Sequence, residues 1–381
     1  MERKTDVITG ETVELESLYV FKDFPVNMLV DAAFSPENDA LFDMSIGISA
    51  NSGCIQLMET LPEEMIYVDK HFNAIGGMWN RQHQTLANLI GKQNDEKILE
   101  IGGGTGILER VYNSYKKNPV KWTIIDPCPN PLNTNAKFIK GYFPASYDPS
   151  IEFDTVVHSH VLEHSYSPCD FIKSVCDILK QGQRMVFSVP NFDALLSECA
   201  TSIINFEHTI CLAEEYVDFL LAKFGFVINE KIHFENHSVI YDTMWTGQPK
   251  STNSLGGLYE KNKKLFKNYI DKHLSQVKKL NYLLEHKERK VFLFGAHIAS
   301  QFYLAFGLHS DKIEMLLDND KSKWGKRLGG SHLLVASPDV LQTFSMPTVI
   351  LPLSPYSDEI KANLTDKLDG NIQFIEMKAL Q

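Results

Sequence analysis

Residues 97–106 have the sequence KILEIGGGTG, and this stretch decides the fold. An apolar run leads to the acidic Glu100 and then breaks into glycines at positions 102, 104 and 106. The pattern predicts a buried strand, a tight turn and a helix whose inner face carries Ile107 and Val111. Glycine suits such a turn because a ligand can lie against its backbone, where N–H groups at the start of a helix are free.

An acidic residue two positions before a G-x-G-x-G pattern resembles the loop that binds S-adenosylmethionine (SAM) in class I methyltransferases. A dinucleotide-binding loop, G-x-G-x-x-G, would need a glycine where this chain has Ile107. The resemblance implies SAM as the cofactor. A second acid, Asp126, ends the next predicted strand, where a carboxylate can accept hydrogen bonds from both ribose hydroxyls. His160 follows a later strand that opens onto the same crevice. The predicted cofactor-binding residues are Glu100, Gly102, Gly104, Gly106, Asp126 and His160.

Residues 80–245 alternate apolar runs with helical patterns, which favours a parallel sheet flanked by helices. The last two apolar segments, 226–234 and 238–243, are separated by three residues and predict a hairpin. An α/β fold is therefore expected, with a doubly wound sheet of the class I methyltransferase type that ends in an antiparallel hairpin. The other strands expected in this sheet are 97–101, 121–125, 137–139, 153–158 and 184–189.

Three parts are expected along the chain. Residues 1–79 form a small, irregular N-terminal module, in which short apolar pieces alternate with polar turns. Residues 80–247 form the SAM-binding domain. Residues 248–381 comprise a long charged linker helix and a second, smaller Rossmann-like domain, whose strand pattern restarts at residue 290.

The overall composition indicates the cellular compartment and disfavours some classes of binding partner. The chain has 381 residues, of which 44% are hydrophobic and 22% charged, as in globular proteins that work in water. The formal net charge of −11 disfavours nucleic acid and anionic membranes as partners. Six scattered cysteines without a C-x-x-C pair indicate a reducing compartment. Because no signal peptide or long apolar run is visible, we expect a cytoplasmic location.

The resemblance extends to the sugar C-methyltransferases of deoxysugar biosynthesis, which follow the fifth strand with a V-P-N segment and a later E-H pair. Here these are Val189-Pro190-Asn191 and Glu207-His208. Residues 53–57 resemble the edge of the family's N-terminal zinc module, and residues 294–300 and 317–326 resemble its C-terminal domain. The resemblance implies that His208 is the general base, which removes a proton from the carbon beside a ketone of a nucleotide-linked sugar. Glu207 could orient His208 or shape the site.

The chain departs from that family at several places. The zinc module needs four cysteines, but Asn51 and Cys54 stand at one pair and the other pair is absent, so we predict no metal. Residues 68–73, with His71, replace a tyrosine-rich segment, and residues 209–212 replace the aromatic residues usual after the E-H pair. The acceptor pocket is therefore lined differently.

Three alternatives stay open on the sequence alone. The first is O- or N-methylation of a carbohydrate or related small molecule on the same scaffold. The second is an NAD-dependent oxidoreductase that uses the Gly295 turn, where His297 and Ser300 replace two glycines and Asp318 lies within reach of a ribose. The third is a binding protein without catalytic activity. The acceptor, the atom methylated and the oligomeric state are not fixed by the sequence.

Overall fold

This computed structural model describes residues 1–26, 30, 35–67, 76–114, 116, 118–201, 203–252, 254–353 and 356–380. They form two compact units, each built from several chain segments. The first unit comprises Met1–Glu16, Gly47–Leu195 and Glu207–Asn262, and the second comprises Ser17–Ile46, Leu196–Phe206 and Lys263–Gln381. Because the segments of the two units interleave, the division into residues 1–79, 80–247 and 248–381 stays a prediction.

The first unit is built on a seven-stranded sheet in the order β6-β5-β4-β7-β8-β10-β9. Strands β4 to β8 pair in parallel, whereas β10 runs antiparallel to both β8 and β9. Its strands are β4 (Lys97–Ile101), β5 (Lys121–Asp126), β6 (Lys137–Lys140), β7 (Thr155–Ser159), β8 (Arg184–Pro190), β9 (Phe226–Phe234) and β10 (Ser238–Trp245). This topology confirms the predicted doubly wound sheet with an antiparallel hairpin at its end.

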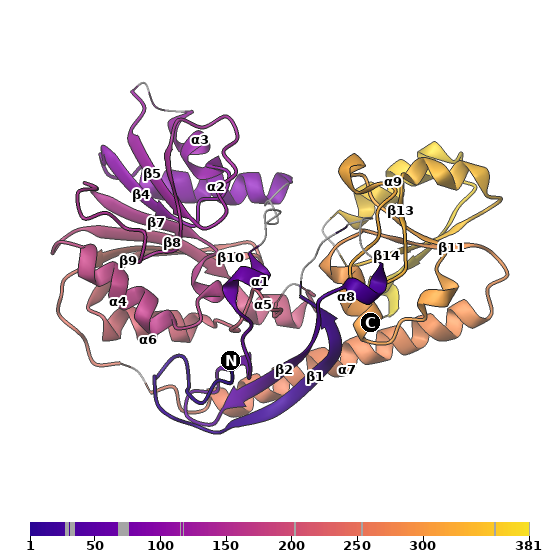
Figure 1. Ribbon diagram of the computed structural model, residues 1–381, viewed down its shortest axis with the longest axis horizontal. Helices are drawn as coiled ribbons and strands as arrows, with labels where there is room; N and C mark the ends of the chain where they lie inside the picture. Colours follow the sequence, from indigo (N-terminus) through magenta and orange to yellow (C-terminus); the bar gives the residue numbers. More distant parts are fainter. Residues whose placement is uncertain are drawn as a thin grey trace. The chain divides into compact units, whose positions relative to one another are not determined.

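Helices cover both faces of this sheet (Figure 1). α2 (Gly77–Ile90) and α3 (Ile107–Asn113) lie on one face, and α4 (Pro168–Ile178) and α6 (Glu214–Lys223) lie on the other. Apolar residues of α2 and α3 form a core with residues of β4 and β5. A sheet covered on both faces needs strands that are apolar throughout, and β8 is buried from Arg184 to Val189. Two short helices, α1 (Glu63–Ile66) and α5 (Phe192–Ser197), complete the set near this sheet.

The N-terminal region is more regular than its sequence suggests. Its apolar segments become β1 (Leu15–Pro25), β2 (Leu41–Ser49) and β3 (Ile55–Leu57), which form a three-stranded sheet in that order. The turn near Cys54 is held by hydrogen bonds: the Asp6 carboxylate accepts from Ile8 N–H and from the Ser49 hydroxyl. Burial raises the pKa of the Cys54 thiol well above its usual value, which disfavours the thiolate that zinc requires. The absence of a structural metal stays a prediction.

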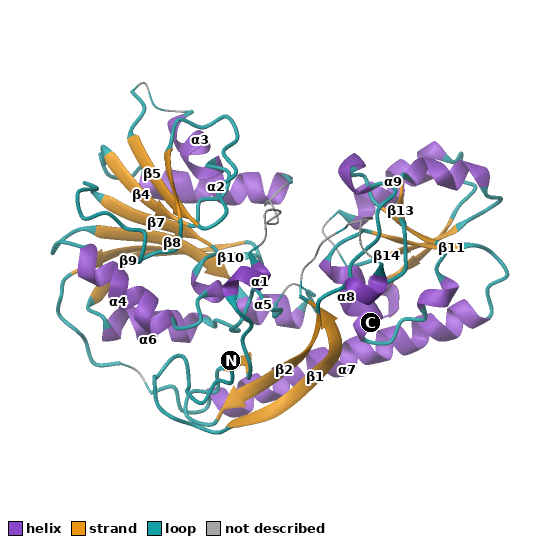
Figure 2. Cartoon of the chain, in the orientation of Figure 1, coloured by secondary structure: helices purple, strands orange, loops and turns teal. Residues whose placement is uncertain are grey.

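The second unit contains a five-stranded parallel sheet in the order β13-β12-β11-β14-β15 (Figure 2). Its strands are β11 (Val291–Phe294), β12 (Met315–Leu317), β13 (Val335–Ala336), β14 (Thr348–Leu351) and β15 (Gln373–Glu376). The helices are α8 (Ile298–Ala305), α9 (Ser357–Lys367) and the 28-residue α7 (Leu258–Glu285), which begins in the first unit. This sheet is the predicted smaller Rossmann-like fold.

None of the helices in the described residues combines the length and the apolar character that crossing a bilayer requires.

Candidate active site

The glycine turn between β4 and α3 has open space at one position. A Cβ added to Gly104, whose φ is +49°, would meet no other heavy atom within 4 Å. A Cβ on Gly102 would come within 2.5 Å of Val161, and one on Gly106 within 2.7 Å of Thr134. These two glycines allow the backbone to pass its neighbours, whereas Gly104 borders a space that a ligand could fill. The turn therefore fits the predicted SAM site.

Asp126 lies at the end of β5, directly beside this turn. Its Oδ2 accepts a hydrogen bond of 2.8 Å from the backbone N–H of Gly104, and its Oδ1 accepts one of 2.8 Å from Cys128 N–H. Each carboxylate oxygen has a second lone pair, so both can still accept a hydroxyl. The acid is thus fixed in place with capacity left for the two hydroxyls of a ribose.

Glu100 lies beneath the turn rather than in the open space. Its Oε2 accepts a hydrogen bond of 2.6 Å from the indole Nε1–H of Trp122, and a Cβ on Gly103 would come within 2.7 Å of its carboxyl carbon. Burial raises the pKa of Glu100 to about 8, and the nearby Asp126 charge adds to this while the Trp122 hydrogen bond opposes it. The geometry supports a role for Glu100 in shaping the turn from below.

His160 follows β7 with a φ of +55°, an uncommon conformation for a side chain other than glycine. Its Nε2 lies 3.0 Å from the Ser238 hydroxyl and its Nδ1 lies 3.1 Å from Oε1 of Glu163. Both ring nitrogens therefore already have polar neighbours in the protein. The prediction that His160 contacts the cofactor stays a prediction.

His208 lies beside a second histidine and a buried carboxylate. The rings of His208 and His164 are 4.6 Å apart, edge to face. The ligand-type atoms of His208, His164 and Glu163 all lie within 4.8 Å of one another. Burial raises the pKa of Glu163 to about 7, while the neighbouring His208 acts in the opposite direction. Imidazole and carboxylate can also hold a divalent metal, so this is where a metal would find ligands among the described residues.

Tyr67 links this cluster to Glu207, the other predicted catalytic residue. The Tyr67 hydroxyl lies 3.2 Å from Nδ1 of His164. The pKa of Tyr67 is raised well above its usual value, mainly by burial and next by the charge of Glu207. The structure thus brings Glu207 near the same group of side chains as His208. His71 and the rest of residues 68–75 lie outside the described residues.

Two members of this cluster, Glu163 and His164, are not among the catalytic or cofactor-binding residues predicted from the sequence. Glu163 and His164 belong to a short 3-10 helix, Leu162–His164, that follows β7 at the carboxyl edge of the sheet. Side chains after parallel strands gather at that edge, so their position offered a signal. Their approach to His208, 44 and more residues along the chain, did not follow from spacing.

The loop that carries His208 is anchored by the start of the chain. The Arg3 guanidinium donates to the backbone oxygen of Thr209 at 2.9 Å, to its hydroxyl at 3.0 Å and to the backbone oxygen of Tyr166 at 3.1 Å. Residues next to Thr209 also pair with β3, through Leu57 N–H to Thr209 O and Cys211 N–H to Ile55 O. The N-terminal module therefore fixes the backbone directly after His208.

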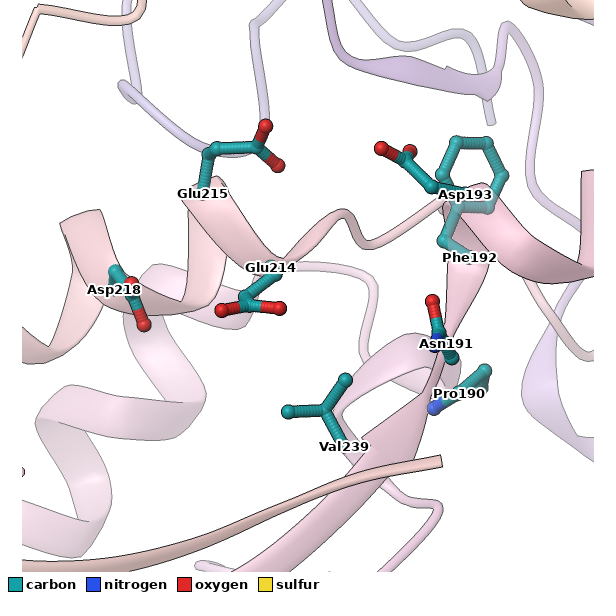
Figure 3. Close-up of a pocket in the computed structure, with 8 residues that line it drawn as sticks. All are labelled: Pro190, Asn191, Phe192, Asp193, Glu214, Glu215, Asp218 and Val239. Atoms are coloured by element: carbon teal, nitrogen blue, oxygen red, sulfur yellow. The ribbon is translucent and has the colours of Figure 1, made fainter. Parts of the chain in front are cut away.

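A separate pocket of about 270 Å³ lies at the end of β8 (Figure 3). Four carboxylates line it, and lysines neutralise them: Lys231 bridges Glu214 and Asp218, and Lys261 bridges Asp193 and Glu215. None of its lining residues is a predicted cofactor or catalytic residue. We therefore place the candidate site at the glycine turn and the histidine cluster.

The second unit has a similar turn after β11, but side chains fill it. A Cβ on Gly295 would come within 2.5 Å of Nε2 of His297. Asp318 accepts hydrogen bonds from Ala296 N–H and from the Lys323 ammonium, both at 2.9 Å. The acid that would bind a ribose in a dinucleotide fold is therefore already paired with a cation. This arrangement disfavours NAD at the Gly295 turn.

Comparison with known families agrees with the two sheets. Residues 78–238 match the family described as "Methyltransferase domain", and residues 257–377 match the family described as "C-methyltransferase C-terminal domain". Among curated proteins, no sequence matches the chain.

Three solved structures that resemble this chain each cover less than half of it. One is the plantazolicin methyltransferase BpumL in complex with a monoazolic desmethylPZN analog and SAH, with 12% identity, 44% of this chain and 84% of that chain covered, and a TM-score of 0.36. Another is the PH0226 protein from Pyrococcus horikoshii OT3, with 17% identity and a TM-score of 0.35; the match covers 48% of this chain and 99% of that chain. A third is a putative S-adenosylmethionine dependent methyltransferase from Listeria monocytogenes, with 14% identity and a TM-score of 0.34; the match covers 43% of this chain and 99% of that chain.

The sheet order, the glycine turn with its two acids and the two matched domains lead to one conclusion. This chain is a SAM-dependent methyltransferase whose larger sheet has the class I methyltransferase fold.

Proposed function

We propose that this enzyme methylates a carbon beside a ketone of a nucleotide-linked sugar, with His208 as the general base. The observation that carries the proposal is the cluster of His208, His164 and buried Glu163, which follows the same sheet edge as the SAM turn. The match of residues 257–377 to the C-terminal domain of C-methyltransferases supports carbon as the methylated atom.

The proposed reaction needs a base that is neutral near pH 7. An imidazole meets this need, because its ordinary pKa lies close to neutrality. The proton leaves the substrate carbon for a ring nitrogen of His208, and the electron pair of the broken C–H bond forms an enolate. The enolate carbon then attacks an electrophilic methyl group, which SAM supplies when bound. In this proposal the acceptor site is also lined by Tyr67, whose hydroxyl lies 3.2 Å from Nδ1 of His164, and by Glu207, whose charge acts on Tyr67.

The cofactor is held, in this proposal, by the residues around the β4–α3 turn. Gly104 offers open space and Asp126 offers carboxylate oxygens. Gly102 and Gly106 keep the turn compact, and Glu100 supports it from below. His160 lies at the end of β7, between this turn and the catalytic cluster in the chain, and its ring edge faces Trp79. Correct alignment of nucleophile and methyl supplies much of the rate acceleration.

Replacing the base tests the proposal. His208→Asn should lower turnover by about 10²- to 10⁴-fold, as expected for loss of a general base, while the affinity for S-adenosylhomocysteine (SAH) stays unchanged. A matched control is His286→Asn, because His286 is exposed and follows α7. Full turnover in His208→Asn would remove the assignment of the base.

Hydrogen exchange separates carbon methylation from its rivals. Wild-type enzyme without SAM, in D₂O, should replace the proton beside the ketone of a nucleoside-diphosphate 4-keto-6-deoxy sugar, as followed by NMR. His208→Asn should not catalyse this exchange. Methylation of a hydroxyl or amine with no exchange at carbon would instead favour an O- or N-methyltransferase.

A further inference from the structure

Four polar side chains form a continuous line from the catalytic cluster to the hairpin of the first unit. Oε1 of Glu163 lies 3.1 Å from Nδ1 of His160. Nε2 of His160 lies 3.0 Å from Oγ of Ser238, and this oxygen lies 2.5 Å from Nδ1 of His237. The line begins after β7 and ends at the first residue of β10 and its neighbour in the hairpin turn. It therefore connects Glu163, inside the cluster, with the outer edge of the sheet.

The line runs from the interior to the surface. Glu163 is 1% exposed and Ser238 is fully buried, whereas His237 is partly exposed. Trp79 packs edge to face on both imidazoles, with ring centroids 4.9 Å from His160 and 4.5 Å from His237. The indole packs against the two rings and gives them an apolar neighbour. Burial lowers the pKa of each of these histidines to about 3, so neither ring retains an extra proton near neutral pH.

The Glu163 carboxylate has imidazole neighbours on two sides. Within the described residues no other residue donates an aligned hydrogen bond to its carboxylate oxygens, and Nδ1 of His160 lies 3.1 Å away on one side. On the other side, ligand-type atoms of His208 and His164 lie within 4.8 Å of it.

The order carboxylate, imidazole, hydroxyl also occurs in hydrolases that use a serine nucleophile. Here that activity is excluded by access, because Ser238 is fully buried and its oxygen is engaged by His237. No substrate carbonyl can reach the hydroxyl. What this geometry can do is move protons between its members.

We propose that Glu163, His160, Ser238 and His237 form a proton relay that carries the substrate's proton from His208 to the surface. The inference rests on the proposed function, because it needs His208 to act as a base. The protonated His208 gives its proton to the Glu163 carboxylate, which then gives it to Nδ1 of His160. His160 releases its Nε2 proton to Ser238, whose hydroxyl proton passes to Nδ1 of His237. His237 releases its Nε2 proton to water. Glu163 is then a carboxylate again, and both imidazoles are neutral with the proton on Nδ1. Rotation of each ring, which exchanges the two nitrogens, restores the starting arrangement before the next cycle.

The relay has a function because the base must be reset in every cycle. His208 is only partly exposed before any substrate is bound. A bound acceptor would cover it further, so direct transfer of the proton to water would be slow. A path through the protein keeps the acceptor site closed while the proton leaves at the β9–β10 hairpin.

Removing the Ser238 hydroxyl tests the relay. Ser238→Ala deletes one oxygen from a buried site and breaks the line, so kcat should fall on the order of tenfold with little change in KM. Added imidazole should restore the rate by accepting the proton from His208 directly, whereas it should not accelerate wild type. The readouts are methyl transfer and hydrogen exchange beside the ketone of the nucleoside-diphosphate 4-keto-6-deoxy sugar. His237→Phe, which keeps an aromatic ring against Trp79, should show the same rescue.

Ser188→Ala is the matched control. Ser188 is also fully buried. It belongs to the neighbouring strand β8, where it lies opposite Ile240 of β10. Its hydroxyl bonds to Gln82 and Ser159, which are not part of the relay. Equal rates in Ser238→Ala and Ser188→Ala would overturn the relay. A loss of activity in Ser238→Ala that imidazole does not restore would also overturn it and assign Ser238 a purely structural role. Absence of exchange in the wild type would instead refute the carbon-acid chemistry, and the relay with it.

Discussion

Two strand–turn–helix junctions in this protein share a hydrogen-bond pattern and differ in what fills them. At β4–α3, the N–H of Gly104 donates to Asp126 at 2.8 Å, and at β11–α8 the N–H of Ala296 donates to Asp318 at 2.9 Å. In both, the acid also accepts from the N–H two residues further on. The backbone of a nucleotide-binding turn is thus present twice.

The two junctions differ in the side chains that surround the turn. Lys323 pairs with Asp318 at 2.9 Å, and the ring of His297 occupies the space beside Gly295. At β4–α3 the hydrogen bonds that Asp126 accepts within the described part of the chain come from backbone N–H groups, and Gly104 borders open space. Both units therefore build the same kind of turn, and the two turns differ in the side chains beside them. In our proposal the open space at Gly104 and the available oxygens of Asp126 make the first turn the cofactor site.

The largest expected effect comes from closing the open turn. Gly104→Ala places a methyl group in the space assigned to SAM and should weaken SAH binding about a hundredfold, or about 2.7 kcal/mol, in calorimetry. The matched control is Gly182→Ala, because Gly182 also has positive φ, at +90°, and nothing within 4 Å of an added Cβ. Both variants should lose similar stability from backbone strain. Equal SAH affinity in the two variants would contradict the assigned position of the cofactor.

A smaller effect is expected from neutralising the two acids. Asp126→Asn keeps the shape of the side chain but weakens hydrogen bonds to a ribose, so SAH affinity should fall about tenfold. Asp318→Asn should leave SAH affinity unchanged and lower the melting temperature, because Lys323 loses its partner. Titration with SAH and thermal melting of both variants check this. If Asp318→Asn weakened SAH binding as much as Asp126→Asn, the contrast between the junctions would be wrong.

The smallest effect concerns the residue two positions before each turn. Burial raises the pKa of Glu100 to about 8, whereas the corresponding residue of the other turn, the buried Leu293, has no ionisable group. The folded state thus holds a proton that the unfolded state releases near its ordinary value. Stability from this group is complete below about pH 4.5 and is lost as pH rises through about 8.

Glu100→Gln should remove this dependence, because an amide stays neutral. The melting temperature of the variant relative to wild type should therefore rise between about pH 5 and about pH 8. Leu293→Met is the control and should follow wild type at every pH. Parallel curves for Glu100→Gln and wild type would show that Glu100 is ionised in the folded protein.

The sequence was sufficient for those parts of the fold that depend on local pattern. Strands 97–101 and 226–234 were predicted with the bounds observed, because apolar runs ended by glycine or a turn mark a buried strand clearly. β1 was not predicted at its full 11 residues, since its alternating polar residues resemble a loop. The partners of individual side chains were not predictable from spacing, as the Lys323–Asp318 pair in one unit and the Trp122–Glu100 bond in the other illustrate.

The same distinction between local pattern and distant contact applies to the candidate site. The glycines and Asp126 could be named because a known motif fixes their order in the chain. The approach of Glu163 and His164 to His208 could not be predicted, because it depends on how a loop returns to the sheet edge. The line from Glu163 to His237 likewise depends on the register of β10 beside β8, which no local pattern encodes.

The bond between Arg3 and Thr209 joins residues that are 206 positions apart in the chain. Closing so long a segment is slow compared with forming the neighbouring helices and hairpin, since distant contacts carry the largest entropy loss before they stabilise anything. The loop that carries His208 therefore acquires its final shape only after most of the first unit has folded. Catalytic competence should lag behind the recovery of helical structure when this protein refolds.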